Sequence, residues 1–146
     1  MSFFNAFDLS ASGLVAQRIR MNTVSSNLAN ASTTRGPDGG PYRRIDPLFA
    51  TAPLPGASTA SFDAALGREL QAVQVRAVVR DLSAPRLVYD PKHPDADPKG
   101  YVKMPNVSVV EEMANMMTAS RSYEANLLAL QTARGMAQKA LNLLGR

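Results

Sequence analysis

The chain's single histidine, His93, lies in the sequence "DPKHPDADPKG" at residues 90–100. Asp90, Asp95 and Asp97 surround it, so the segment holds the residue types of a metal site or of an acid–base pair. However, it lacks the central glycine and the terminal glutamate of a calcium-binding loop, and three prolines interrupt it. We therefore predict a solvated surface loop at this position and no metal site.

Two other patterns contain residue types used in catalysis but have a structural explanation. Glu111 and Glu112 are adjacent carboxylates, and acidic side chains are favoured at the positive end of a helix dipole, where a helix is predicted to begin. The sequence "GPDGG" at 36–40 lacks the lysine and the spacing of a phosphate-binding loop, so it predicts a turn.

The serines do not form a pattern that indicates nucleophilic catalysis. Six serines have no histidine within sequence reach that would suggest a catalytic triad: Ser10, Ser12, Ser25, Ser26, Ser120 and Ser122. We predict no catalytic residue, no cofactor and no enzymatic activity.

The composition narrows the class of protein. Among 146 residues, 45% are hydrophobic, 19% are charged, the net charge is +4, and cysteine is absent, which excludes disulfide bonds. The basic residues are scattered, with Arg43–Arg44 as the one adjacent pair, so no basic stripe predicts nucleic-acid binding. The first residues, "MSFFNAFDLSASGLVAQ", lack the pattern of a signal peptide, and no apolar run reaches the roughly 18–20 residues of a membrane span.

The distribution of proline predicts the organisation of the chain. All ten prolines lie between Pro37 and Pro105, and proline does not continue a helix interior. We therefore expect a helix within residues 1–36, a turn and extended middle region at 37–105, and a second helix within 106–146. The predicted fold class is mainly α, with long terminal helices packed as a coiled-coil-like pair and a short β-hairpin middle.

The carboxy-terminal segment has the strongest periodicity. Apolar residues recur at two heptad positions over about five heptads, which predicts a coiled-coil-like seam. Ser108 followed by Glu111 predicts a capping box at the start of this helix, and Gly145 predicts its end. The first heptad position comprises Val109, Met116, Tyr123, Leu130, Ala137 and Leu144, and the second comprises Met113, Ser120, Leu127, Arg134 and Leu141.

The amino-terminal segment has a weaker heptad pattern, formed by Phe7, Leu14, Met21 and Leu28. Many of its other residues are Ser, Thr or Asn, which are indifferent or poor helix formers. We expect this helix to depend on packing. Because two helices alone each bury one stripe, the remaining faces need partners.

The middle region predicts short strands. "VQVRAVVR" at 73–80 alternates in the manner of a half-buried strand, and "RLVYD" at 86–90 and "YVKM" at 101–104 are expected to pair with it. The sequences "APLPGAST" at 52–59 and "DPKHPDADPKG" at 90–100 predict loops.

Polar residues are dense on the second helix, in "ASRSYEAN" at 119–126. One interpretation is an ordinary solvated face. The alternative is a contact between helices in a packed array, where amides and hydroxyls fix the register and the small Ala119 and Ala125 allow close approach.

Three blocks of sequence resemble the rod–hook axial protein family of the bacterial flagellum. They are "NLANASTTRGPDGGPYR" at 27–43, "KGYVKMPNVSVVEEM" at 99–113 and "ASRSYEANLLALQTAR" at 119–134. In that family the first block usually closes with a Thr-Pro-Gly-Tyr turn, and "TTRGPDGGPY" here resembles the longer turn of one basal-body rod protein. The middle, residues 45–98, matches no pattern of the family.

The resemblance implies a structural subunit whose terminal helices pack as a pair and stack helically into a tube. It implies copies of the chain and other rod proteins as partners, together with the membrane ring and adaptor at the rod base. It also implies passage through the flagellar type III export apparatus without a cleaved signal peptide, and location in the periplasm-spanning rod, where the tube transmits motor torque for motility.

The resemblance also implies subunit-contact residues, to which the apolar stripe adds four. It assigns Asn27, Leu28, Asn30, the turn residues Gly36, Pro37, Asp38, Gly39 and Tyr42, and the helix residues Arg121, Tyr123, Glu124 and Asn126. The stripe adds Met113, Met116, Leu127 and Leu130. The remaining alternatives are another axial protein of the rod or hook type, a coiled-coil adaptor, and a basic nucleic-acid-binding module.

Overall fold

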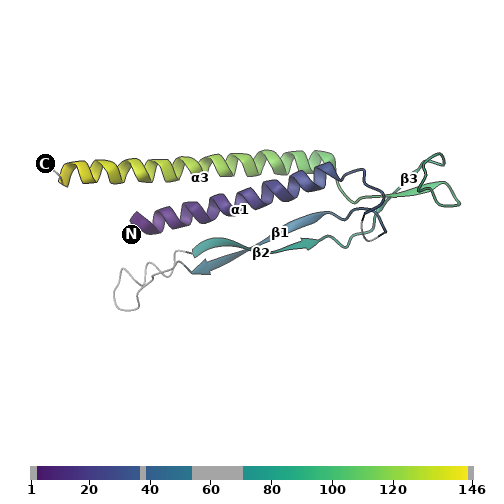
Figure 1. Cartoon of the computed structure of the whole chain (residues 1–146), viewed down its shortest axis with the longest axis horizontal. Helices are drawn as coiled ribbons and strands as arrows, with labels where there is room; N and C mark the ends of the chain where they lie inside the picture. The colour runs from purple at the N-terminus through teal and green to yellow at the C-terminus, as the bar shows by residue number, and fades with distance from the viewer. Residues whose placement is uncertain (1–2, 37–38, 54–70, 145–146) are drawn as a thin grey trace. The chain divides into compact units, whose positions relative to one another are not determined.

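The computed structural model describes residues 3–36, 39–53 and 71–144 (Figure 1). Its elements are α1 (Phe3–Ala29), β1 (Ile45–Pro53), β2 (Gln71–Arg80), β3 (Arg86–Tyr89), β4 (Tyr101–Met104) and α3 (Val109–Leu144). The prediction of one long helix near each end, with short strands between them, is confirmed. Pro37, Asp38, Gly145 and the predicted loop from residue 54 to 59 lie outside the described residues.

Asn30 makes several hydrogen bonds at the end of helix α1. The carbonyl of Ser26 accepts from both the backbone amide of Asn30, at 3.1 Å, and its side-chain Nδ2, at 2.9 Å. The Oδ1 of Asn30 accepts from Thr33 Oγ1 at 3.2 Å, and its carbonyl accepts from the amide of Thr33 at 3.1 Å. Asn30 therefore connects the last turn of α1 to the turn that follows.

The strands form two separate two-stranded sheets. β1 pairs with β2, whose arrows run in opposite directions in Figure 1, and β3 pairs antiparallel with β4, with Leu87 opposite Lys103 and Val88 opposite Val102. The expectation of a β-hairpin in the middle region is confirmed by β3 and β4, but the expectation that these two segments pair with 73–80 is wrong. The partner of β2 is β1, a strand that the sequence pattern hid because Pro47 and Pro53 interrupt it.

The chain divides into two compact units, each of which takes a part of both helices. Unit 1 comprises Met1–Ile19, Leu48–Ala77 and Ala119–Arg146. Unit 2 comprises Arg20–Pro47 and Val78–Thr118.

The two units bury different kinds of residue. Among the described residues of unit 1, the buried hydrophobic ones are all alanines: Ala16, Ala72, Ala119 and Ala133. Unit 2 buries the larger Val24, Val102 and Val107, together with three polar residues, Thr23, Asn27 and Glu112. Among the described residues the core is therefore small, and its polar part lies in unit 2.

The predicted seam of α3 is half correct. At the first heptad position Met116, Tyr123, Leu130 and Ala137 are half-buried, whereas Val109 is exposed. At the second position, Met113, Leu127, Arg134 and Leu141 are exposed, and the buried residues instead lie one place earlier, at Glu112, Ala119 and Ala133. The sequence pattern is dominated by large apolar side chains, but the side chains of α3 that are buried are small or polar, and small side chains allow helices to approach closely.

Candidate functional site: a buried polar junction and an exposed apolar helix face

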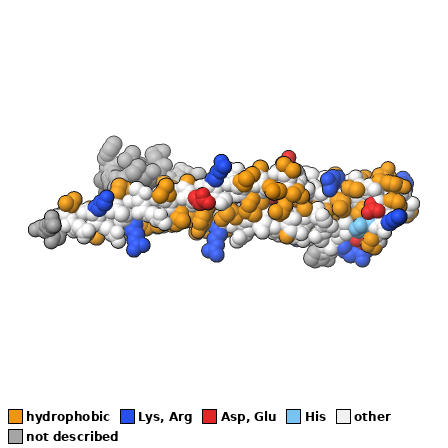
Figure 2. Space-filling model, turned by 90° about the horizontal axis from the view of Figure 1, so that it is seen from above, with side chains coloured by type: hydrophobic (Ala, Val, Ile, Leu, Met, Phe, Trp, Pro, Cys, Tyr) orange, Lys and Arg blue, Asp and Glu red, His pale blue; other side chains and the backbone are white. Residues whose placement is uncertain are grey.

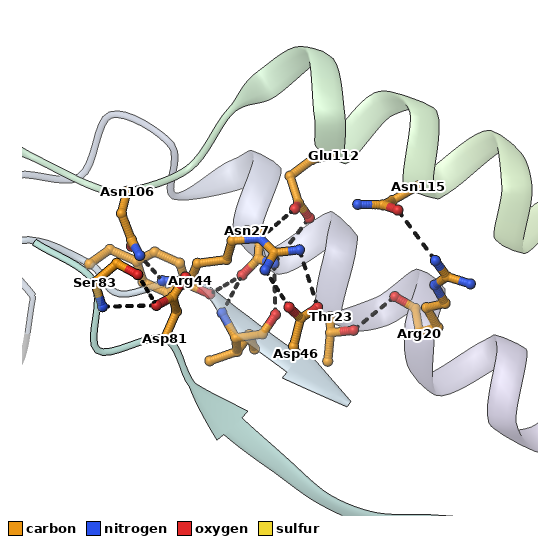
Figure 3. A network of polar contacts seen from close by, with 12 residues as sticks. Arg20, Thr23, Asn27, Arg44, Asp46, Asp81, Ser83, Asn106, Glu112 and Asn115 are labelled. Carbon is orange, nitrogen blue, oxygen red and sulfur yellow. Dashed lines mark hydrogen bonds and ion pairs between the residues drawn. The ribbon is translucent and has the colours of Figure 1, made fainter. Parts of the chain in front are cut away.

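Asn27 forms the centre of the junction between α1 and β1 (Figure 3). Its Nδ2 donates to the carbonyl of Ile45 at 2.8 Å and to Glu112 Oε2 at 3.0 Å. Its Oδ1 accepts from the amide of Ile45 and from the hydroxyl of Tyr42, both at 2.9 Å. The side chain is 0% exposed, so every hydrogen-bonding position of a buried amide is used within this chain.

Glu112 and Arg44 form the charged part of the junction. The carboxylate of Glu112 is 1% exposed, and its Oε1 accepts from Arg44 Nε at 2.7 Å. The guanidinium of Arg44 also pairs with Asp46. Burial by itself lowers the pKa of Arg44, but the hydrogen bond to Glu112 and the charge of Asp46 outweigh it, so the pKa is raised above its usual value. A buried carboxylate is therefore held as one member of a satisfied ion pair.

Backbone contacts connect the junction to the sheet and to the segment before α3. The amide of Arg44 donates to Asn106 Oδ1 at 3.2 Å, and its carbonyl accepts from the amide of Asp81 at 2.8 Å. Asp81 is itself held by Ser83, whose hydroxyl and amide both donate to Asp81 Oδ1. These hydrogen bonds lower the pKa of Asp81.

Two polar contacts show that the helices run antiparallel within unit 2. Arg20 of α1 donates to Asn115 of α3 at 3.3 Å, and Asn27 donates to Glu112 (Figure 3). Residue numbers rise along α1 while those of their partners fall along α3. In unit 1, a Cβ built on Gly13 would lie 2.8 Å from Asn126 Nδ2, so the absence of a side chain at Gly13 makes room for Asn126.

The loop that contains the single histidine is connected to the turn after α1. Asp95 accepts from Thr34 Oγ1 at 2.8 Å and pairs with Arg35 at 2.7 Å. His93 Nδ1 accepts from the amide of Asp95 at 3.1 Å, which is a local turn contact. In the described part of the chain, His, Asp and Glu form no group of three that could hold a metal ion.

Helix α3 exposes a large amount of hydrophobic surface. Figure 2 shows hydrophobic side chains at the surface of the molecule, interrupted by only a few charged ones. Nine large hydrophobic residues of α3 are exposed: Val109, Val110, Met113, Met117, Leu127, Leu128, Met136, Leu141 and Leu143. Exposed apolar side chains gathered on one helix are typical of a surface that contacts a partner.

The predicted contact residues fall into three groups. Asn27 and Asn30 make the contacts described above within the chain, and Tyr42 bonds Asn27. Leu28, Gly39, Met113, Arg121, Glu124 and Leu127 are exposed, whereas Gly36, Met116, Tyr123, Asn126 and Leu130 are half-buried.

Sequence reasoning missed Glu112, Arg44, Asp46 and Ile45 as members of the junction. Glu112 has the position of a helix-dipole residue, and Arg44 that of an ordinary surface cation beside Arg43. The pairing depends on residues more than 60 positions apart, and no local spacing encodes it.

Comparison with known families defines the class of protein. A model described as "Flagella basal body rod protein" matches residues 7–37, and one described as "Flagellar basal body rod FlgEFG protein C-terminal" matches residues 99–143. Each matched segment covers most of one long helix of the structure, α1 or α3. Neither described helix has an apolar stretch of the length a membrane span requires.

Comparison with individual proteins identifies the family within this class. The flagellar basal-body rod protein FlgC of Escherichia coli O6:H1 is 46% identical over 143 residues, which cover 98% of each chain. The FlgC of Borreliella burgdorferi is 42% identical over 153 residues, covering 99% of each chain. That of Bacillus subtilis is 40% identical over 151 residues, covering 98% of this chain and 99% of the relative. The chain therefore belongs to the FlgC family of flagellar basal-body rod proteins, and it is a structural subunit of the rod.

Proposed function

We propose that the chain assembles with its own copies and with other rod proteins through the exposed face of α3, as part of the proximal rod that transmits motor torque across the periplasm. The observation that carries this proposal is the exposure of large hydrophobic side chains on α3, such as Leu128 at 64% and Leu141 at 67%. Burial of that surface against neighbours is the dominant favourable contribution to most protein association. The role is structural, without catalysis.

The three-part division belongs to the same proposal. Residues 1–36 and 106–146 form an inner, coiled-coil-like helical module, and residues 37–105 form the outer part. Within the module, the exposed Leu28, Met113, Arg121, Glu124 and Leu127 are assigned to subunit contacts. The half-buried Met116, Tyr123, Asn126 and Leu130 contribute from the edge of the same face.

Delivery and location complete the proposal. We infer that the chain passes unfolded through the flagellar type III export apparatus without a cleaved signal, and that it joins the rod near the membrane ring and its adaptor. The small core supports this inference, because a chain that buries mostly alanine in unit 1 loses little packing energy when it unfolds.

A double substitution on the exposed face tests the proposal. Leu128→Glu with Leu141→Glu, introduced in the host bacterium in place of the natural chain, should reduce swimming and the yield of isolated basal bodies with rods by about tenfold or more. An unpaired carboxylate buried at a subunit contact costs several kcal/mol, and each 1.4 kcal/mol is a factor of ten. Swimming in soft agar and electron microscopy of purified basal bodies measure the two effects.

The matched control is Leu82→Glu with Leu87→Glu, which makes the same substitution at two exposed leucines outside α3. This variant should swim normally. If the α3 variant builds rods as well as this control does, the apolar face of α3 is not an assembly contact.

A further inference from the structure

The contact between α1 and α3 in unit 2 is made by polar groups with fixed directions. Asn27 donates to one oxygen of Glu112 at 3.0 Å, and Arg44 donates to the other at 2.7 Å. The same Asn27 side chain pairs with both backbone groups of Ile45, the first residue of β1. One buried carboxylate therefore contacts the helix α1 and the residue that precedes the outer strand.

We propose that Glu112 is a positioning residue, which fixes the axial register of α1 against α3 and joins the start of β1 to that register. The inference rests on the proposed function, because it concerns how the exposed face of α3 is presented for assembly. Glu112 is 1% exposed and acts through Asn27 and Arg44.

A carboxylate is required because two separate donors approach its two oxygens. A glutamine has one oxygen and one amide nitrogen, so in either orientation its nitrogen would face a donor, that of Asn27 or that of Arg44. The charge of Arg44 would also lose its buried partner. Glu112→Gln therefore preserves the size of the side chain while it removes the double acceptor.

Apolar packing alone would not fix this register. Hydrophobic contact is non-directional, and the buried alanines of α1 and α3 would still contact an apolar surface after a slip along the axis. A slip of one helical turn, about 5.4 Å, would bring Asn115 or Met116 opposite Asn27. Met116 is no acceptor for an amide comparable with a carboxylate, and Asn115 offers a single oxygen. The register seen here is the one in which both donors are satisfied.

A disulfide reporter measures the register directly, because the natural chain has no cysteine. A Cβ built on Gly13 lies 3.1 Å from Asn126 Cγ, the position that the sulfur of a cysteine at 126 would occupy. In a disulfide, a Cβ lies about 3 Å from the partner's sulfur, as follows from an S–S bond of about 2.04 Å. Gly13→Cys with Asn126→Cys should therefore cross-link in this register.

The first experiment compares rates of cross-linking in the full-length chain. With Glu112 present, the Gly13→Cys, Asn126→Cys pair should oxidise rapidly under a mild oxidant. Adding Glu112→Gln should slow the oxidation about tenfold, because the pair then meets only when the helices reach this register. Adding Glu111→Gln instead should leave the rate unchanged, since Glu111 is the exposed neighbour. Equal rates in all three chains would overturn the proposal.

The second experiment asks whether the register is what assembly needs. In the host bacterium, Glu112→Gln alone should reduce the number of basal bodies with complete rods about tenfold or more. The disulfide should restore assembly to the Glu112→Gln chain under oxidising conditions and not under reducing ones. The reference is the cross-linked chain that keeps Glu112, since Asn126 is itself assigned to the edge of the contact face. If that reference assembles and the cross-linked Glu112→Gln chain does not, Glu112 acts in another way; if neither assembles, a disulfide-free comparison of Glu112→Gln with Glu111→Gln decides whether Glu112 is needed for rods.

The test of Glu112 and the test of the proposed function can fail independently of each other. If Leu128→Glu with Leu141→Glu assembles normally, the assignment of the apolar face fails. The change in cross-linking rate with Glu112→Gln would still establish or refute the role of Glu112 in the register.

Discussion

The junction in unit 2 and the α3 segment in unit 1 differ in burial and in the kind of side chain they contain. In the junction, Asn27 and Glu112 are 0% and 1% exposed, and their hydrogen-bonding groups are satisfied within the chain. In the α3 segment of unit 1, from residue 134 to 143, no residue is buried, and Met136, Leu141 and Leu143 are exposed. The polar groups of the junction are satisfied within the chain, whereas the segment leaves large apolar side chains exposed.

The difference shows how one chain can combine a specific internal geometry with a surface suited to association. Buried hydrogen bonds are directional, and leaving one partner unsatisfied costs about 1–3 kcal/mol, so they select one geometry. Exposed apolar surface gives association energy without selecting a geometry. The polar junction therefore selects the local geometry of unit 2, and under the proposed function the apolar segment supplies the energy of the subunit contacts.

The largest expected effect is in hydrogen exchange. In the dilute full-length chain, the amides of Ile45 and Asp81, both hydrogen-bonded at the junction, should exchange about a hundredfold or more slowly than the helical amides from 134 to 143. The α3 segment has helical hydrogen bonds but little tertiary packing, and a helix without packing is marginal in water. Exchange followed by mass spectrometry or NMR measures the ratio.

Assembly should remove this contrast. In isolated rods the amides from 134 to 143 should become as slow as those of the junction, because neighbours then cover the helix. Slow exchange over this segment in the dilute chain would mean that α3 is stable alone, and the comparison between the two regions would fail.

The sequence predicted the parts of the fold that local rules determine. The absence of proline in 106–146 and the heptad pattern predicted α3, which begins at Val109, directly after the expected cap Ser108. The strand at 101–104 was predicted at its observed bounds. These features depend on neighbouring residues, so spacing and backbone restrictions are sufficient to predict them.

The remainder depends on contacts between distant residues. The pairing of β1 with β2 was missed because two prolines obscured the first strand. The Asn27–Glu112 contact joins residues 85 positions apart, and the sequence shows only two ordinary polar residues. The alternation of large apolar residues on α3 was visible, but whether they face α1 or solvent depends on how closely the helices approach.

Two glycines offer a smaller test of the same comparison. Gly13 lies where α1 is in contact, since a Cβ there would be 2.8 Å from Asn126 Nδ2, whereas a Cβ at Gly135 of α3 would meet nothing within 4 Å. Gly135→Ala should stabilise the chain by about 0.5–1 kcal/mol through helix propensity alone. Gly13→Ala has the same gain in propensity, but Asn126 must move, which costs about 1–3 kcal/mol.

The measurable quantity is the difference between the two variants, about 1–3 kcal/mol in the free energy of unfolding, because the equal gains in propensity cancel. Urea titration followed by circular dichroism at the helix band provides it. Equal stabilisation by both alanines would show that α1 has no close contact at Gly13, and the reporter pair at 13 and 126 would then be poorly placed.

The smallest expected effect concerns the pKa of Asp81, which lies at the periphery of the junction. Its amide bonds the carbonyl of Arg44, and its carboxylate accepts from the hydroxyl and the amide of Ser83, which lower its pKa. A carboxyl whose pKa is lower in the folded chain than in the unfolded chain stabilises the fold at neutral pH, and this stabilisation disappears as the pH falls through the folded pKa. Ser83→Ala removes the hydroxyl, so the pKa of Asp81 should rise toward its ordinary value, and the loss of stability between neutral and acidic pH should become smaller.

NMR titration of the Asp81 carboxyl measures the pKa, and Ser25→Ala, at an exposed serine of α1, should leave the pKa of Asp81 unchanged. Because Asp81 is only half-buried and Ser83 is exposed, solvent screens this contact, and assembly should be normal in the Ser83→Ala chain. A loss of rods on the scale expected for Glu112→Gln would extend the junction to Asp81 and remove the boundary drawn here between its buried and its solvated part.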